Sequence, residues 1–172
     1  MERLIGLKLP DLVFPATLAD VNDSCAISPA RIPGRVVLYL YPYTGRSQVP
    51  DPPDWDTIPG AHGSTPQAAG FAALAGDYRS AGVTVLGLSG QPPQWQAEFA
   101  ARLSLPFALL SDPPLMLARA LSLPTFSTGD VTYLRRLTLV LRDGVITDVV
   151  YPVATPGAHA AELLERVAKT AR

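Results

Sequence analysis

Two short runs of almost continuous apolar residues constrain the fold more than any other feature of this sequence. They lie at 36–41 and 83–88 and consist mainly of valine, leucine and tyrosine. Runs of this length are typical of strands that are covered on both faces of a sheet. Between them, residues 67–80 repeat apolar side chains at helical spacing. Alternating strands and helices indicate an α/β domain with a parallel core sheet and helices on both faces.

The remaining segments extend this arrangement at both ends. Residues 11–14 and 17–20 are predicted to be short strands of an N-terminal β-hairpin. Asp143 and Gly144 separate two apolar runs, which is a good signal for a second hairpin. The other predicted elements are a helix at 95–103, a strand at 107–110, a helix at 115–121, strands at 137–141 and 145–151, and a helix at 158–171. We therefore expect one α/β, thioredoxin-like domain over residues 1–172, with a central mixed sheet flanked by helices.

A proline-rich segment at about 43–63 interrupts this pattern directly after the first apolar run. It contains four prolines and three glycines, and both residue types favour loops. A loop of this length in a compact domain is usually functional or disordered. We interpret it as an insertion that leads into the sequence Gly-Ala-His-Gly-Ser-Thr-Pro-Gln at 60–67.

Ser64 falls near the expected start of the helix that follows the insertion. Free backbone N–H groups and the helix dipole favour negative charge at such a position. The position therefore suits a nucleophile or an anion, although no obvious base would activate the serine. A helix N-cap is the plainer interpretation of Ser64. His62 is interpreted as a solvated loop residue rather than a base.

Composition and charge exclude several classes of protein. The formal net charge is −1 and no run of Lys or Arg occurs, so a nucleic-acid partner has no electrostatic support. No apolar run approaches the roughly 20 residues of a membrane helix, and the first residues lack the pattern of a secretion signal. We therefore expect a cytoplasmic protein without a membrane partner. Cys25 is the single cysteine, which excludes an internal disulfide. His62 and His159 show no metal-ligand spacing, so no metal is expected.

Five segments, in this order and spacing, resemble the peroxiredoxins, and most closely the peroxiredoxin Q or bacterioferritin comigratory protein group. The resemblance covers almost the whole chain. The segments are Leu-Pro-Asp-Leu at 9–12, Val-Val-Leu-Tyr-Leu-Tyr-Pro at 36–42, Val-Leu-Gly-Leu-Ser at 85–89, Leu-Pro-Phe-Ala-Leu-Leu-Ser-Asp-Pro at 105–113, and Arg-Leu-Thr-Leu-Val-Leu at 136–141 followed by Asp-Gly.

The resemblance implies specific roles for individual residues. The family loop Gly-Cys-Thr-Pro-Gln-x-Cys places its peroxide-attacking cysteine on Ser64 and its resolving cysteine on Ala69. Arg136 would contact the thiolate and the peroxide, and Pro42 would shield the sulfur. The family threonine lies three residues before the first cysteine, where this chain has Ala61. Thr44, and less well Thr57, would then supply the hydroxyl.

The same resemblance implies an antioxidant activity. The parent protein would be a thiol-dependent peroxidase for hydrogen peroxide and organic hydroperoxides. Thioredoxin or a similar dithiol would reduce it, and it would act as a monomer without a cofactor. With Ser64 and Ala69 in place of both sulfurs, this chain is expected to be inactive, because the reaction needs a thiolate. It is either an engineered cysteine-substituted variant or a natural redox-dead relative that uses segment 43–63 to bind a partner or a small anion.

Plainer interpretations accompany these roles. Ala69 would be an ordinary helix residue, Arg136 a surface arginine beside Arg135, and Pro42 a strand terminator. Cys25 is interpreted as a stray thiol, with a resolving role as the alternative. Asp112 is expected to be a turn acceptor and Trp95 a core aromatic. A serine hydrolase has little support, because the residues around Ser64 do not form the Gly-x-Ser-x-Gly elbow. The sequence also shows no His–Asp pair placed to activate this serine.

Overall fold

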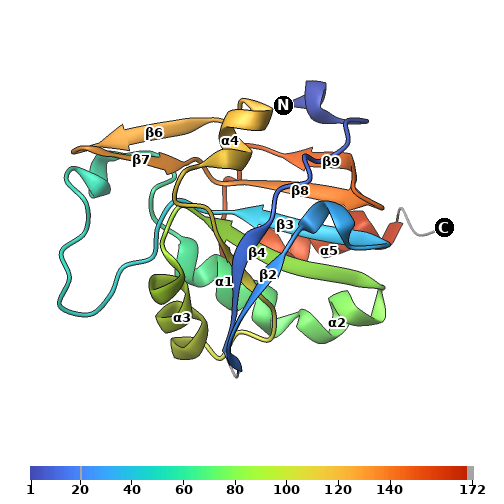
Figure 1. Cartoon of the computed structure of the whole chain (residues 1–172), viewed down its shortest axis with the longest axis horizontal. Helices are drawn as coiled ribbons and strands as arrows, with labels where there is room; N and C mark the ends of the chain where they lie inside the picture. Colours follow the sequence, from blue (N-terminus) through green and yellow to red (C-terminus); the bar gives the residue numbers. More distant parts are fainter. Residues whose placement is uncertain (20, 170–172) are drawn as a thin grey trace.

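The computed structural model describes residues 1–19 and 21–169. In these residues a seven-stranded mixed sheet has the order β2-β1-β5-β4-β3-β8-β9, and β6 and β7 form a separate hairpin (Figure 1). The strands are β1 (Phe14–Leu18), β2 (Val21–Ile27), β3 (Arg35–Leu40), β4 (Val83–Ser89), β5 (Leu109–Ser111), β6 (Thr125–Thr128), β7 (Val131–Leu134), β8 (Leu137–Arg142) and β9 (Val145–Val150). The helices are α1 (Ser64–Ala73), α2 (Ala75–Ser80), α3 (Pro93–Arg102), α4 (Met116–Leu121) and α5 (His159–Lys169).

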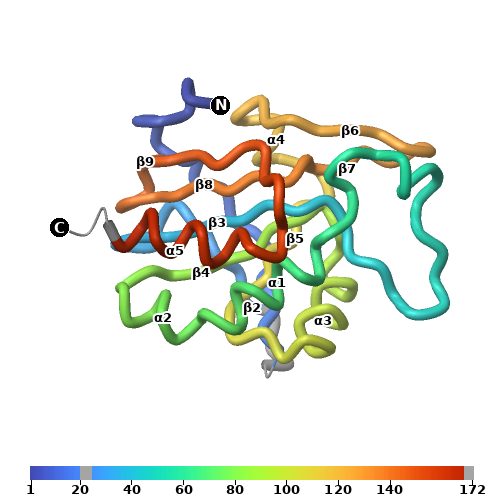
Figure 2. Tube along the Cα trace, turned by 180° about the vertical axis from the view of Figure 1, so that it is seen from behind, coloured from blue at the N-terminus to red at the C-terminus, as the bar shows by residue number. Residues whose placement is uncertain are grey.

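Strand β3 lies inside the sheet, between β4 and β8, and separates two apolar cores. It pairs in parallel with β4 and antiparallel with β8. Its side chains alternate between the two cores, because successive residues of a strand point to opposite faces. Helices α1, α2, α3 and α5 cover the face that carries Val37 and Tyr39, and α4 with the N-terminal segment covers the other face. Figure 2 shows α1, α2 and α5 in front of the sheet.

The predicted architecture is confirmed: a mixed sheet flanked by helices, with an N-terminal β-hairpin. The parallel strands β3 and β4 match the two apolar runs, and Asp143 and Gly144 form the turn between β8 and β9. Gly144 has a φ of 76°, and a Cβ there would collide with the carbonyl of Ala30. Glycine is therefore required at this turn. No helix in the described residues combines the length and apolar character that crossing a bilayer requires.

Several boundaries differ from the prediction. The second strand of the N-terminal hairpin is β2, not residues 17–20, and Asp20 lies outside the described residues, as do 170–171 of the final predicted helix. The predicted helix at 67–80 begins earlier, at Ser64, and is divided at Leu74, whose φ and ψ are −101° and 10°. Phe71 in α1 and Tyr78 in α2 both lie in the same core. The apolar spacing therefore continues across the break between the two helices and does not reveal it.

Trp95 is not a core aromatic. It is only partly buried, and the buried face of α3 consists of Gln96, Phe99 and Ala100. Phe99 of the predicted helix at 95–103 is buried, but Gln96 rather than Trp95 accompanies it on the buried face.

Asp112 is confirmed as a turn acceptor. Its carboxylate is fully buried and accepts the backbone N–H groups of Met116 at 2.8 Å and Leu117 at 3.0 Å. Burial raises the pKa of this carboxyl, and the two N–H donors oppose that effect.

We expect Asp112→Ala to lower the free energy of unfolding by about 2–3 kcal/mol, because both donors lose a buried acceptor. Urea unfolding at pH 7 measures this, and an unchanged midpoint would contradict it. Asp112→Asn, which keeps one acceptor, is the matched control and should lose less.

Candidate active site around Ser64

The backbone before α1 delivers Ser64 to the first turn of the helix. Gly63 has a φ of 108°, and a Cβ there would come within 2.6 Å of Pro156. Glycine is therefore the residue that both the left-handed backbone and the close approach of Pro156 require. Ser64 is the first residue of α1 and is 5% exposed. Gly63 occupies the N-cap, and no side chain caps the helix, so the interpretation of Ser64 as an N-cap is wrong.

Arg136, the residue directly before β8, contacts Ser64. Its Nη2 donates to Ser64 Oγ at 3.1 Å and to the carbonyl of His62 at 3.0 Å, and its Nη1 donates to Gln67 Oε1. The side chain is 4% exposed, so the interpretation of Arg136 as a surface arginine is wrong. Two residues that are distant in the sequence are thus brought into direct contact.

The charge of Arg136 is not balanced by a carboxylate in the described part of the chain. Burial lowers its pKa to about 10, which leaves the guanidinium protonated at neutral pH. Its Nε–H has no hydrogen-bond partner in the described structure. A buried cation of this kind favours an anionic neighbour, and a thiolate at position 64 would be such a neighbour.

Thr44 is buried and is held by Gln91. The backbone N–H and the hydroxyl of Thr44 donate to Gln91 Oε1 at 2.9 Å and 3.0 Å. Its carbonyl accepts from Trp95 Nε1 at 2.6 Å. Thr57 is exposed and donates to the carbonyl of Asp54 instead. The structure therefore brings Thr44, rather than Thr57, to the surroundings of Ser64.

Ser64 and Thr44 line one cavity of about 290 Å³. We call this the Ser64 cavity. The first turn of α1 forms one wall, and the insertion at 43–63 forms the other. The lining residues are Tyr43, Thr44, Gly45, Asp51, Trp55, Ala61, His62, Gly63, Ser64, Thr65 and Pro66.

The other predicted site residues lie apart from this cavity. Pro42 is buried just beyond β3 but is not a lining residue. Ala69 is exposed on α1, whereas Ser64 is buried. Cys25 lies on the edge strand β2, where its Sγ donates to the carbonyl of Ala16 at 3.6 Å. The described side chains include no cluster of three or more His, Cys, Asp or Glu residues suited to a metal ion.

A His–Asp pair, which the sequence did not reveal, includes His62, two residues before Ser64. His62 Nε2 is 2.8 Å from Asp56 Oδ1, and His62 is largely exposed. In the described structure, however, the hydrogen bond to Ser64 Oγ comes from Arg136 and none comes from His62. The pair therefore gives the serine hydrolase interpretation no base that is in contact with the nucleophile.

The insertion is an ordered wall that packs on the β6–β7 hairpin. Trp55 is 4% exposed, and its ring lies 5.1 Å from that of Tyr133 and 5.7 Å from that of Phe126. Tyr43 packs edge-on against Trp55 at 5.4 Å. These aromatic contacts hold the part of the insertion around Trp55 against the domain, beside the Ser64 cavity. The tip of the insertion projects from the domain (Figures 1 and 2).

Sequence reasoning missed two buried glutamines that hold predicted site residues in place. Gln67 is completely buried and binds Arg136, and Gln91 holds Thr44. Gln67 stands three residues after Ser64, and this spacing places both on one helix face. That spacing could have identified Gln67, whereas nothing in the sequence connects Gln91 with Thr44.

Comparison with known proteins places the chain in a family. The family model described as AhpC/TSA family matches residues 58–149. The chain is 32% identical over 151 residues to peroxiredoxin Q, chloroplastic, of Oryza sativa subsp. japonica, a match that covers 87% of this chain and 61% of that protein. It is 31% identical over 153 residues to the protein of the same name from Sedum lineare, covering 88% and 73%. The chain thus spans about three fifths of the length of the rice relative.

Solved structures show the same thioredoxin-like fold. The C47S mutant of Xylella fastidiosa PrxQ superimposes with a TM-score of 0.77 at 21% identity, covering 98% of this chain and 97% of that one. Xanthomonas campestris peroxiredoxin Q gives a TM-score of 0.71 at 24% identity, covering 96% and 98%. The expected fold class is therefore confirmed.

Proposed function

The chain belongs to the AhpC/TSA family of peroxiredoxins, and from this premise we propose that its site is that of a peroxiredoxin Q-type thiol peroxidase whose two redox cysteines are replaced by Ser64 and Ala69. The observation that carries the proposal is the 3.1 Å hydrogen bond from Arg136 to Ser64 Oγ at the start of α1. A guanidinium and a helix N-terminus both stabilise a thiolate.

In the cysteine-bearing protein the reaction would begin at position 64. The thiolate would attack the terminal oxygen of a hydroperoxide, so that an S–O bond forms and the O–O bond breaks. Arg136 would stabilise the developing charge of the leaving alkoxide or hydroxide, which would take a proton from solvent water. The products of this step are a sulfenic acid and an alcohol or water. The hydroxyl of Thr44 is the proposed second donor to the peroxide.

A thiol at position 69 would then resolve the sulfenic acid. It would attack the sulfur at position 64, forming a disulfide and releasing water. Five residues span about 7.5 Å along a helix, and the Cα atoms of a disulfide usually lie within about 7 Å. Because Ser64 is buried and Ala69 is exposed, the first turns of α1 would have to unwind. A dithiol such as thioredoxin would supply the two electrons that restore both thiols.

The chain with Ser64 cannot complete this chemistry, because a serine hydroxyl is a weak nucleophile without a base and is not oxidised in this way. The alternative function is a redox-dead binding module, and the unbalanced charge of Arg136 is the observation that favours it. Cysteines at positions 64 and 69 in the source sequence would support the peroxidase and exclude a naturally redox-dead module.

The variant Ser64→Cys tests the proposed site directly. We expect the new thiol to have a pKa below about 7, compared with about 8.5 for a free cysteine, because Arg136 and α1 both favour the thiolate. The pH dependence of alkylation measures this pKa. One equivalent of hydrogen peroxide should then give a sulfenic acid that dimedone traps and mass spectrometry detects. The experiment uses a Cys25→Ser background, so that the thiol at position 64 is the only one that can be alkylated or labelled by dimedone. A thiol with an ordinary pKa and no dimedone adduct would count against the peroxidase.

A further inference from the structure

Arg136 lacks the negative partner that its position calls for. In the described structure it binds neutral acceptors, namely Gln67 Oε1, Ser64 Oγ and the carbonyls of Ala61 and His62. It is 96% buried, and its Nε–H is unpartnered there. A buried charge without a counter-ion is destabilising. A thiolate at position 64 would supply the counter-charge, and the serine of this chain does not.

A second cavity in the described structure borders Arg136 and differs in charge from the Ser64 cavity. The Ser64 cavity includes the carboxylate of Asp51, which opposes the entry of an anion, and does not include Arg136. The second cavity measures about 300 Å³ and has two arginines and no acidic residue in its lining. We call it the Arg135 pocket. Its lining residues are Pro59, Gly60, Phe126, Arg135, Arg136, Tyr151, Pro152, Val153 and Ala154.

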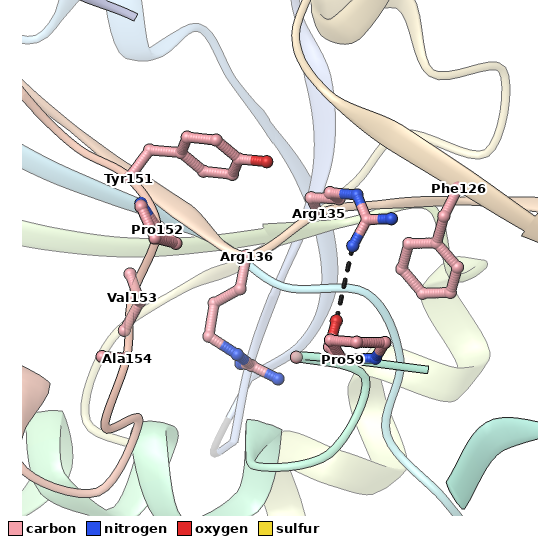
Figure 3. A pocket seen from close by; sticks show the side chains of 9 residues that line it. Pro59, Phe126, Arg135, Arg136, Tyr151, Pro152, Val153 and Ala154 are labelled. Carbon is pink, nitrogen blue, oxygen red and sulfur yellow. Dashed lines mark hydrogen bonds between the residues drawn. The ribbon is translucent and has the colours of Figure 1, made fainter. Parts of the chain in front are cut away.

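Figure 3 shows how these side chains surround the hollow. Arg135 and Arg136 project from the segment that leads into β8, toward Pro59, and the chain from Tyr151 to Ala154 forms the opposite wall. Arg135 is partly exposed, and its Nη1 donates to the carbonyl of Pro59 at 3.4 Å. A hydrogen bond this long is weak, so Arg135 can turn to a ligand at little cost.

The chemistry of the lining defines the ligand. Two adjacent guanidinium groups bind a carboxylate through charge-assisted hydrogen bonds. The ring of Phe126 lies 5.2 Å from the guanidinium of Arg135, and Val153 and Ala154 add apolar surface. A volume of about 300 Å³ lies at the small end of ligand sites. We propose that the Arg135 pocket binds a small monocarboxylate with an apolar body, and that Arg135 and the charge of Arg136 hold its carboxylate.

The pocket is coupled to the Ser64 cavity through one guanidinium. Arg136 lines the Arg135 pocket and also donates to Ser64 Oγ. A carboxylate in the pocket therefore competes with a negative charge at position 64 for the same cation. Occupancy of one site weakens anion binding at the other, and this coupling is reciprocal.

Isothermal titration calorimetry of the unaltered chain with phenylacetate and its neutral isostere phenylacetamide tests the proposal. We expect phenylacetate to bind in the millimolar range or tighter and phenylacetamide to bind at least about tenfold more weakly, because it lacks the charge. Arg135→Gln should weaken phenylacetate binding by about fivefold to tenfold. Ala154→Phe should abolish binding by filling the pocket, and it remains informative if the Arg135 variant does not fold.

Two matched controls locate the site. Asp51→Asn should leave phenylacetate binding unchanged, and so should Arg79→Gln, which removes an exposed arginine on α2. The proposal is overturned if the acid and the amide bind equally, or if phenylacetate does not bind. It is also overturned if Asp51→Asn strengthens binding while Arg135→Gln has no effect, because the anion would then occupy the Ser64 cavity.

Discussion

Replacing Ser64 and Ala69 together by cysteine is expected to raise peroxide turnover with a thioredoxin reducing system by about 10⁴-fold or more over the unaltered chain. Removing a catalytic nucleophile from an enzyme costs a factor of this order or larger, and restoring one should return it. The hydrogen bond from Arg136 to position 64 and the start of α1 are already in place. The consumption of NADPH coupled to thioredoxin reductase measures the turnover.

The two single variants separate the roles of the positions. In a Cys25→Ser background, Ser64→Cys alone should consume about one equivalent of peroxide and then stop, because no thiol at position 69 resolves the sulfenic acid. Ala69→Cys alone should remain inactive, because no thiol stands beside Arg136. If the double variant is folded and does not turn over, the peroxidase proposal loses its main support, and the binding module becomes the better interpretation.

In the double variant, replacing Arg136 by glutamine is expected to slow the reaction with peroxide by about 10²–10³-fold. This is the usual loss when one donor to a developing negative charge is removed. The variant also removes the cation that stabilises the thiolate, so the thiol pKa should rise toward its ordinary value. Arg136→Lys keeps the charge but loses the planar fork, and we expect an intermediate rate. Competition kinetics with a second peroxidase of known rate measures the reaction.

The control for this experiment is Arg79→Gln in the same double variant, which removes an exposed positive charge on α2. It should leave both the rate and the thiol pKa unchanged. An Arg136→Gln protein that is folded and reacts as fast as the double variant would exclude Arg136 from the chemistry.

The sequence predicted the elements whose burial dictates their composition. Strands β3 and β4 are covered on both faces and are therefore almost continuously apolar. Strand β2 was missed because Asn22, Asp23 and Ser24 resemble a loop, and an edge strand needs no apolar run. The β6–β7 hairpin was also missed, because its strands have four residues each and include threonine and serine.

The prediction of the site depended on a different kind of information. No periodicity connects Ser64 with Arg136, and the resemblance to a family was the only reason to expect them together. The fold brings them into contact because α1 packs beside β3, and β3 pairs with β8. The sequence did not indicate where the insertion lies, because its position depends on aromatic contacts between Trp55 and the hairpin residues Phe126 and Tyr133.

The aromatic wall of the insertion gives the molecule an optical property. The chain has two tryptophans, and neither belongs to the apolar cores of the sheet. Trp55 lines the Ser64 cavity. Trp95 donates to the carbonyl of Thr44, and the guanidinium carbon of Arg46 lies 4.2 Å from the centre of the Trp95 ring. The tryptophan fluorescence of this protein, excited selectively over that of tyrosine, therefore originates around the cavity. A change in tryptophan emission reports on the insertion and the surroundings of Ser64, whereas the aromatic side chains in the core of the sheet are tyrosines and phenylalanines.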